Sequence, residues 1–112
     1  MTKNILFISM DDCAAYWDYR SVFKEKLQTP NLDRICERAS VFRAAYCAAP
    51  LCGPSRASLM SGIAPHQLGV VSNNDYVFNH ISLKQMWSFD LKTHGYFCSP
   101  GGKVHHYFGA MD

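Results

Sequence analysis

Residues 4–12 read NILFISMDD, a nearly continuous apolar run that stops at two adjacent carboxylates. An apolar run of this length is typical of a strand that is buried on both faces within a parallel sheet. Asp11 and Asp12 would then stand at the carboxyl end of that strand, the edge where open α/β sheets bind their ligands. The stretch therefore predicts an α/β fold with a candidate site beside its first strand.

The segments that follow alternate between helical and extended patterns. Thr29 and Pro30 supply a cap and a first-turn proline for a helix predicted at residues 30–39. Residues 41–46, VFRAAY, predict a second strand, and residues 96–99, YFCS, predict a third. Strand, helix and strand in this order are the layout of a βαβ layer.

Two further helices are predicted between the second and third strands. The first starts after Cys52 and ends at Gly62, because glycine is the usual residue just past a helix. Ser82 is a good cap for the second, which carries apolar residues at helical spacing and ends at Gly95.

Two stretches have no clear period. Residues 13–28 predict a loop with a helical turn near residues 22–27. Residues 63–80 contain proline, glycine and an Asn-Asn-Asp cluster, which favour an irregular surface segment next to a site.

Composition limits the class of protein. The 112 residues are 48% apolar and 13% aromatic, which suits one small globular unit spanning residues 1–112. The net charge of +2 is spread along the chain, so neither a nucleic acid nor a membrane surface is indicated as partner. Five cysteines without a scaffold spacing argue against a disulfide framework.

No apolar run approaches the roughly 18 residues that a membrane span needs, and the run at residues 4–10 is too short for a signal peptide core. The sequence as it stands predicts a cytoplasmic protein. A leader missing from this sequence would instead predict a periplasmic or secreted one.

Residues 52–62, CGPSRASLMSG, place a cysteine at a predicted helix start, with Arg56 one turn further along. Backbone N–H groups and the positive end of the helix dipole favour an anion at such a place. The alternative is an ordinary core cysteine ahead of a Pro-Ser-Arg helix start.

The pattern C-x-P-S-R-x-x-x-x-x-G in these residues resembles the signature of Cys-type sulfatases. The resemblance extends to the Asp-Asp pair, to TPNLDR at residues 29–34 and to GKVHH at residues 102–106, in the same order. It implies an alkaline phosphatase/sulfatase-like α/β fold, a mixed but mostly parallel sheet flanked by helices. Sulfatases are several times longer, so residues 1–112 are expected to form the N-terminal part of a catalytic domain, with the C-terminal part absent.

The resemblance assigns a metal site and a modified residue. Adjacent carboxylates are costly without a cation, and hard oxygen ligands favour Ca²⁺ or Mg²⁺. The family implies Ca²⁺, with Mg²⁺ as the alternative, held by Asp11, Asp12 and the modified Cys52. In sulfatases that cysteine is oxidised to formylglycine, whose hydrate attacks sulfur with one hydroxyl, frees the alcohol, and expels sulfate through the other.

The remaining roles also follow the resemblance. Arg56 holds the formylglycine hydrate, and Lys103 contributes a point charge toward the sulfate oxygens. His106 is preferred as the proton-handling histidine because Lys-x-x-His is typical of iduronate-sulfatase-like members, but the Lys-x-His spacing of arylsulfatases keeps His105 open. Ser55 is expected to cap the helix.

The implied partners are a small-molecule or carbohydrate sulfate ester and the formylglycine-generating enzyme, which reads Cys52, Pro54 and Arg56. Three alternatives remain at this point. A phosphonate monoester hydrolase or phosphodiesterase of the same superfamily uses the same residues. A zinc-binding module would use the cysteines and histidines, although their spacing is unsuitable. A truncated chain would be inactive.

Overall fold

The computed structural model describes residues 3–12, 24–25 and 27–106. The chain divides into two compact units, Met1–Ala45 and Tyr46–Asp112, and each is described by itself. The loop and helical turn predicted at residues 13–28 lie for the most part outside the described residues.

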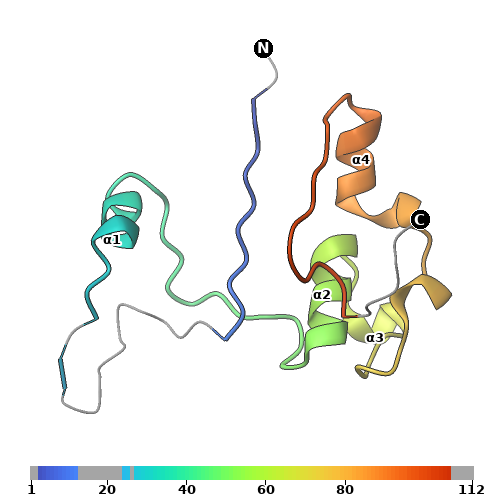
Figure 1. The fold of residues 1–112 in the computed structure, drawn as a ribbon. Helices are drawn as coiled ribbons and strands as arrows, with labels where there is room; N and C mark the ends of the chain where they lie inside the picture. The colour runs from blue at the N-terminus through green and yellow to red at the C-terminus, as the bar shows by residue number, and fades with distance from the viewer. Residues whose placement is uncertain (1–2, 13–23, 26, 107–112) are drawn as a thin grey trace. The chain divides into compact units, whose positions relative to one another are not determined.

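Helix α1, Pro30–Cys36, lies in the first unit (Figure 1). It begins where the sequence predicts, with Pro30 in its first turn and Thr29 as N-cap. The Thr29 hydroxyl donates to the Asp33 carboxylate at 3.2 Å instead of accepting from the helix backbone. The sequence predicts an end at Ala39, but the helix ends at Cys36. Packing supplies most of the stability of a short helix, and none of the residues of α1 is buried, so little holds a longer helix together.

The three predicted strands are wrong for the part of the chain that the structure describes, which contains no strand. Residues 4–10 are extended, as Figure 1 shows, but Leu6 is 84% exposed and Ile8 70% exposed. A turn interrupts residues 41–46 at Arg43 and Ala44, and residues 96–99 form no element. A strand is defined by hydrogen bonds to a neighbouring strand, so apolar sequence alone does not produce one.

Helix α2, Cys52–Ser61, is the central element of the second unit. Gly62 ends it with a left-handed φ of 72°, which confirms the predicted stop. The predicted cap is wrong: the N-cap is Leu51, in extended conformation, and its carbonyl accepts from the Ser55 amide at 3.0 Å. Ser55 therefore lies inside the first turn.

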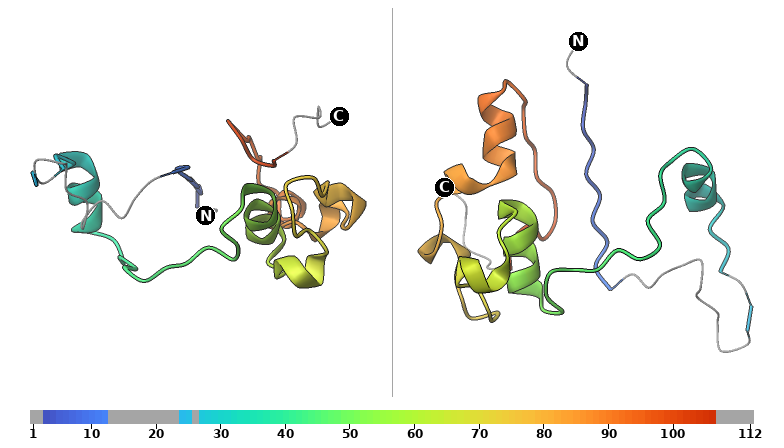
Figure 2. Two further views of the ribbon diagram at one scale, coloured as in Figure 1. Left: turned by 90° about the horizontal axis from the view of Figure 1, so that it is seen from below. Right: turned by 180° about the vertical axis from the view of Figure 1, so that it is seen from behind.

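The remaining elements of the second unit are short. They are α3 (Pro65–Leu68), the 3-10 helices η1 (Val77–Asn79) and η2 (Leu83–Gln85), and α4 (Trp87–Thr93). Helix α2 contacts both α3 and α4, and Figure 2 shows the three helices from two further sides. The Trp87 indole donates to the Leu59 carbonyl of α2 at 3.2 Å.

A small apolar core holds this unit together. Its buried members are Ala57, Met60, Leu68, Val70, Val77, Ile81 and Met86, and Ile63, Phe78 and Val104 pack against them. Residues 63–80, predicted as an irregular surface segment, contain α3 and η1 and supply three of the core side chains. Val70 among them is fully buried.

The helix predicted after Ser82 is divided in two at Met86. Ser82 and Gln85 form the predicted cap as a reciprocal capping box. Met86 is then extended, with φ −99° and ψ 139°, and its side chain is 2% exposed. Its carbonyl accepts from the amides of Phe89 and Asp90, which starts α4. The extended backbone of Met86 thus coincides with burial of its side chain in the core. Helix α4 ends at Thr93, two residues before the predicted end at Gly95.

Candidate functional site

The N-terminus of α2 carries the candidate nucleophile. Cys52 is the first residue of the helix, half-buried, with a free thiol. The next amide, that of Gly53, donates to the Asn73 side-chain oxygen at 2.7 Å. The first amides of a helix have no partner within the helix, so Asn73 satisfies one of them from 20 residues away.

Gly53 is required for this contact. A Cβ atom at Gly53 would lie 3.1 Å from the Asn73 side-chain oxygen and 3.2 Å from the Ser72 carbonyl oxygen. Residues 72–75 therefore form a turn that lies directly against the start of α2. Glycine allows this approach because it has no side chain.

Asp75 fixes the conformation of that turn. One of its carboxylate oxygens accepts from the Val71 amide at 2.8 Å and from the Ser72 amide at 2.7 Å. These hydrogen bonds hold the pKa of Asp75 below its ordinary value, because they stabilise the ionised carboxylate. The sequence pointed to a turn here, but it assigned no role to Asn73 or Asp75.

Arg56 connects α2 to the Gly-Lys motif. Its guanidinium donates to the main-chain carbonyl of Lys103, 47 residues further along the chain. The structure thus brings together two of the motifs that sequence reasoning singled out. The connection uses the Lys103 backbone, and Lys103 itself is exposed.

A cavity of about 10 Å³, the size of a single water molecule, lies beside the helix start. It is lined by Gly53, Arg56, Ala57, Asp75, Tyr76, Val77, His105 and His106. The Nδ1 atoms of His105 and His106 are buried, and neither has a hydrogen-bond partner among the described residues. Two histidines thus line the cavity, each with a buried ring nitrogen that no described residue hydrogen-bonds.

His105 differs from His106 in its surroundings. Its ring meets the Phe78 ring edge to face, with centroids 5.1 Å apart and planes at 72°. Burial lowers the pKa of His105 below its ordinary value, and the Arg56 charge lowers it further, since both disfavour an imidazolium.

The predicted metal ligands lie in the first unit. Asp11 and Asp12 are exposed neighbours in a turn at the end of the apolar run, and Asp12 has a positive φ of 52°. Two carboxylates suit a hard divalent cation, which takes six to eight oxygen ligands when it is Ca²⁺. Within the described ranges, no three His, Cys, Asp or Glu side chains form a potential metal site. The zinc alternative therefore gains no support there.

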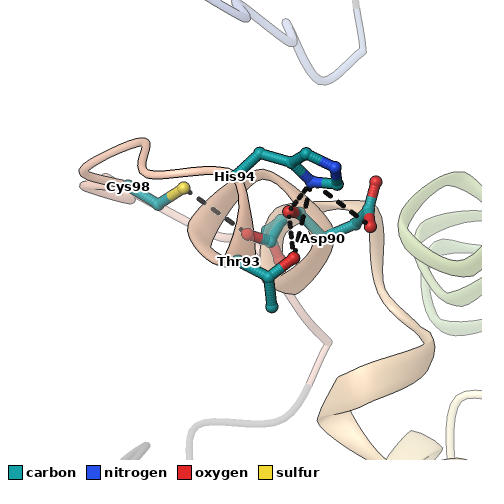
Figure 3. Close-up of polar contacts among 5 residues, drawn as sticks. Asp90, Thr93, His94 and Cys98 are labelled. Atoms are coloured by element: carbon teal, nitrogen blue, oxygen red, sulfur yellow. Dashed lines mark hydrogen bonds and ion pairs between the residues drawn. The ribbon is translucent and has the colours of Figure 1, made fainter.

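Two other polar groups lie away from the cavity. His66 is exposed on α3 and does not line it. At the end of α4, the ring of His94 lies 2.8 Å from the Asp90 carbonyl and 3.7 Å from its carboxylate (Figure 3). Both side chains are about 70% exposed, at 69% and 73%, so this is a local contact at a helix end.

Within the described part of the chain, no helix combines the length and the apolar character that a membrane crossing requires.

Comparisons with known proteins give a consistent result. The family model described as Sulfatase matches residues 3–98. A sulfatase of Formosa agariphila is 42% identical over 67 residues, which are 60% of this chain and 13% of the relative. N-acetylgalactosamine-6-sulfatase of Sus scrofa is 40% identical over 77 residues, covering 68% of this chain and 14% of the relative. Choline-sulfatase of Rhizobium meliloti is 33% identical over 79 residues, covering 70% and 15%.

No solved structure gives a significant match. The matched part of the chain spans 13% to 15% of the length of these three relatives. The family match implies the alkaline phosphatase-like α/β fold, although the described residues contain no strand. With a match over 96 of its 112 residues, the chain belongs to the sulfatase family.

Proposed function

We propose that the protein containing these residues is a sulfuric ester hydrolase that cleaves a sulfate monoester. The observation that supports this proposal is the hydrogen bond between Arg56, one turn after Cys52 in α2, and the Lys103 carbonyl of the Gly-Lys segment. A helix start with a nearby guanidinium stabilises a tetrahedral anion, which is what sulfate transfer requires. The family match adds that proteins with this sequence pattern are named sulfatases.

The proposal includes conversion of Cys52 to formylglycine by the formylglycine-generating enzyme. Formylglycine, once formed, supplies a hydrated aldehyde with one hydroxyl as nucleophile and a second through which sulfate is expelled. Cys52 is half-buried at the first position of α2, where the first backbone amides have no partner within the helix. The position therefore suits a nucleophile that faces an anion.

Arg56 and Lys103 would bind the anion, and His106 would transfer the proton. Arg56 is held by the Lys103 carbonyl, so its guanidinium is oriented before a substrate binds. His106 lines the cavity beside Arg56 and is proposed as the residue that handles the proton. Lys103 is exposed and would add a positive charge toward the sulfate oxygens.

Asp11 and Asp12 are proposed to hold Ca²⁺, with Mg²⁺ as the alternative and residue 52 as a further ligand. When bound, the cation would neutralise charge on the reacting oxygens. The two carboxylates supply only part of the six to eight oxygen ligands of Ca²⁺, so further ligands are expected from elsewhere in the protein.

The substrate is proposed to be a small-molecule or carbohydrate sulfate ester. A cavity of about 10 Å³ holds no group larger than water, so both the sulfate group and the organic part of the ester would bind outside it. Lys-x-x-His spacing favours an iduronate-sulfatase-like carbohydrate sulfatase.

The test uses the full-length protein, produced together with its maturation enzyme. The Cys52 peptide should lose about 18 Da, because an aldehyde replaces the thiol-bearing carbon. Cys52→Ala should abolish hydrolysis of an aryl sulfate, whereas Cys47→Ala, at an exposed cysteine, should not. Normal hydrolysis with an unmodified thiol would contradict the proposal, and faster turnover of an aryl phosphonate would favour a phosphonate hydrolase.

A further inference from the structure

Residues 101–106 are attached to the second unit at three points. The Lys103 carbonyl accepts from Arg56. Val104 packs against the apolar core. The His105 ring rests edge to face against Phe78, at a centroid distance of 5.1 Å. His105 supplies the aromatic contact among these three attachments.

Charged and titratable groups lie near the His105 ring. Arg56 from α2 faces the same cavity, as do Asp75 and Tyr76 from the turn before η1, and His106 from the segment itself. The Asp75 carboxylate is already engaged by two backbone amides, so it compensates an imidazolium less than a free carboxylate would. The nearby guanidinium and the partial burial both favour an uncharged ring.

We propose that His105 is a positioning residue which, in its neutral form, docks residues 101–106 onto Phe78. This docking holds the Lys103 carbonyl against Arg56 and keeps His106 at the cavity. Protonation of His105 releases the segment, and with it both of these contacts. The link to catalysis rests on the proposed function, whereas the docking itself does not.

The direction of the pH effect follows from the lowered pKa of His105. The pKa of His105 is lower in the docked state than its ordinary value of 6.5. The released state therefore binds the proton more readily, so docking is complete above about pH 6.5 and is lost as the pH falls through the lowered value.

NMR titration of the full chain between pH 5 and 8 tests this at the Phe78 ring and the Val104 methyl groups, because Phe78 contacts His105 and Val104 packs on the core in the docked state. In the wild type, these signals should shift below about pH 6.5, while those of Met60, a core residue of α2, stay constant. His105→Phe preserves an aromatic edge against Phe78 and removes the titration, so its Val104 signals should not shift over this range.

His66→Phe is the matched control, because His66 is exposed and does not line the cavity. It should retain the pH dependence of the wild type. Equal pH-dependent shifts of the Val104 signals in His105→Phe and wild type would overturn the proposal. Should His105→Phe fail to fold, NMR titration of the His105 ring in the wild type decides: a pKa at or above the ordinary value overturns the proposal, and a lower one supports it.

These measurements detect docking and not turnover. A result that overturns the docking would leave the proposed hydrolase function standing. Absence of sulfatase activity in the full-length protein would leave the docking result valid.

Discussion

Replacement of Gly53 by alanine tests the contact between α2 and the turn at residues 72–75. The added Cβ would lie 3.1 Å from the Asn73 side-chain oxygen, 3.2 Å from the Ser72 carbonyl and 3.3 Å from the Asn73 Cα. Two of these three atoms are backbone, so the turn has to move as a whole. Any such movement also weakens the 2.7 Å hydrogen bond from the Gly53 amide to Asn73.

Two opposing effects set the magnitude. Overpacking of this kind costs about 1–3 kcal/mol. Alanine in place of glycine within a helix returns about 0.5–1 kcal/mol, because the unfolded chain has less freedom to lose. The free energy of unfolding should therefore fall by about 1 kcal/mol in Gly53→Ala.

Urea unfolding of the full chain, followed by circular dichroism, measures this change as a lower midpoint at constant slope. The control is Gly101→Ala, since a Cβ at Gly101 meets no atom within 4 Å. Gly101→Ala should leave the midpoint close to that of the wild type. If Gly53→Ala is as stable as this control, or more stable than the wild type, the close approach of the turn to α2 is refuted.

Two further predictions concern the same turn. Asn73→Ala removes the acceptor of the Gly53 amide and should lower the free energy of unfolding by about 1 kcal/mol, as loss of a helix cap does, while Asn74→Ala, at an exposed neighbour, should have little effect in the same urea assay. Equal effects of the two would contradict the role of Asn73. Asp75 has a pKa below its ordinary value of 3.8, so its contribution to stability is present above that pH and is lost as the pH falls through the lowered value. Acid unfolding of Asp75→Asn should lack that component, and an unchanged acid profile would show that the carboxylate does not hold the turn.

Local signals in the sequence were reliable where they concern one turn of backbone. Pro30 marked the start of α1, Gly62 marked the end of α2, and Ser82 formed its expected cap. Each of these depends on residues only a few positions apart, so no distant contact is needed. Met86 is the exception within a predicted helix: it is extended, and its side chain is in the core.

The strand predictions failed for the opposite reason. Residues 4–10 have the apolar composition of a buried strand, but a strand needs a partner that its own sequence does not contain. In the described residues no such partner is present, and the segment is extended and exposed.

The motif around Cys52 and the order of the motifs on either side are enough to assign the family, because such a pattern is carried by residue identity alone. Three contacts could be found only in the folded chain: Arg56 with the Lys103 carbonyl, Asn73 with the amide after Cys52, and His105 with Phe78. These contacts join residues 20 to 47 positions apart. Whether residues so far apart in the sequence come into contact depends on how the core packs, and no local sequence pattern predicts that packing.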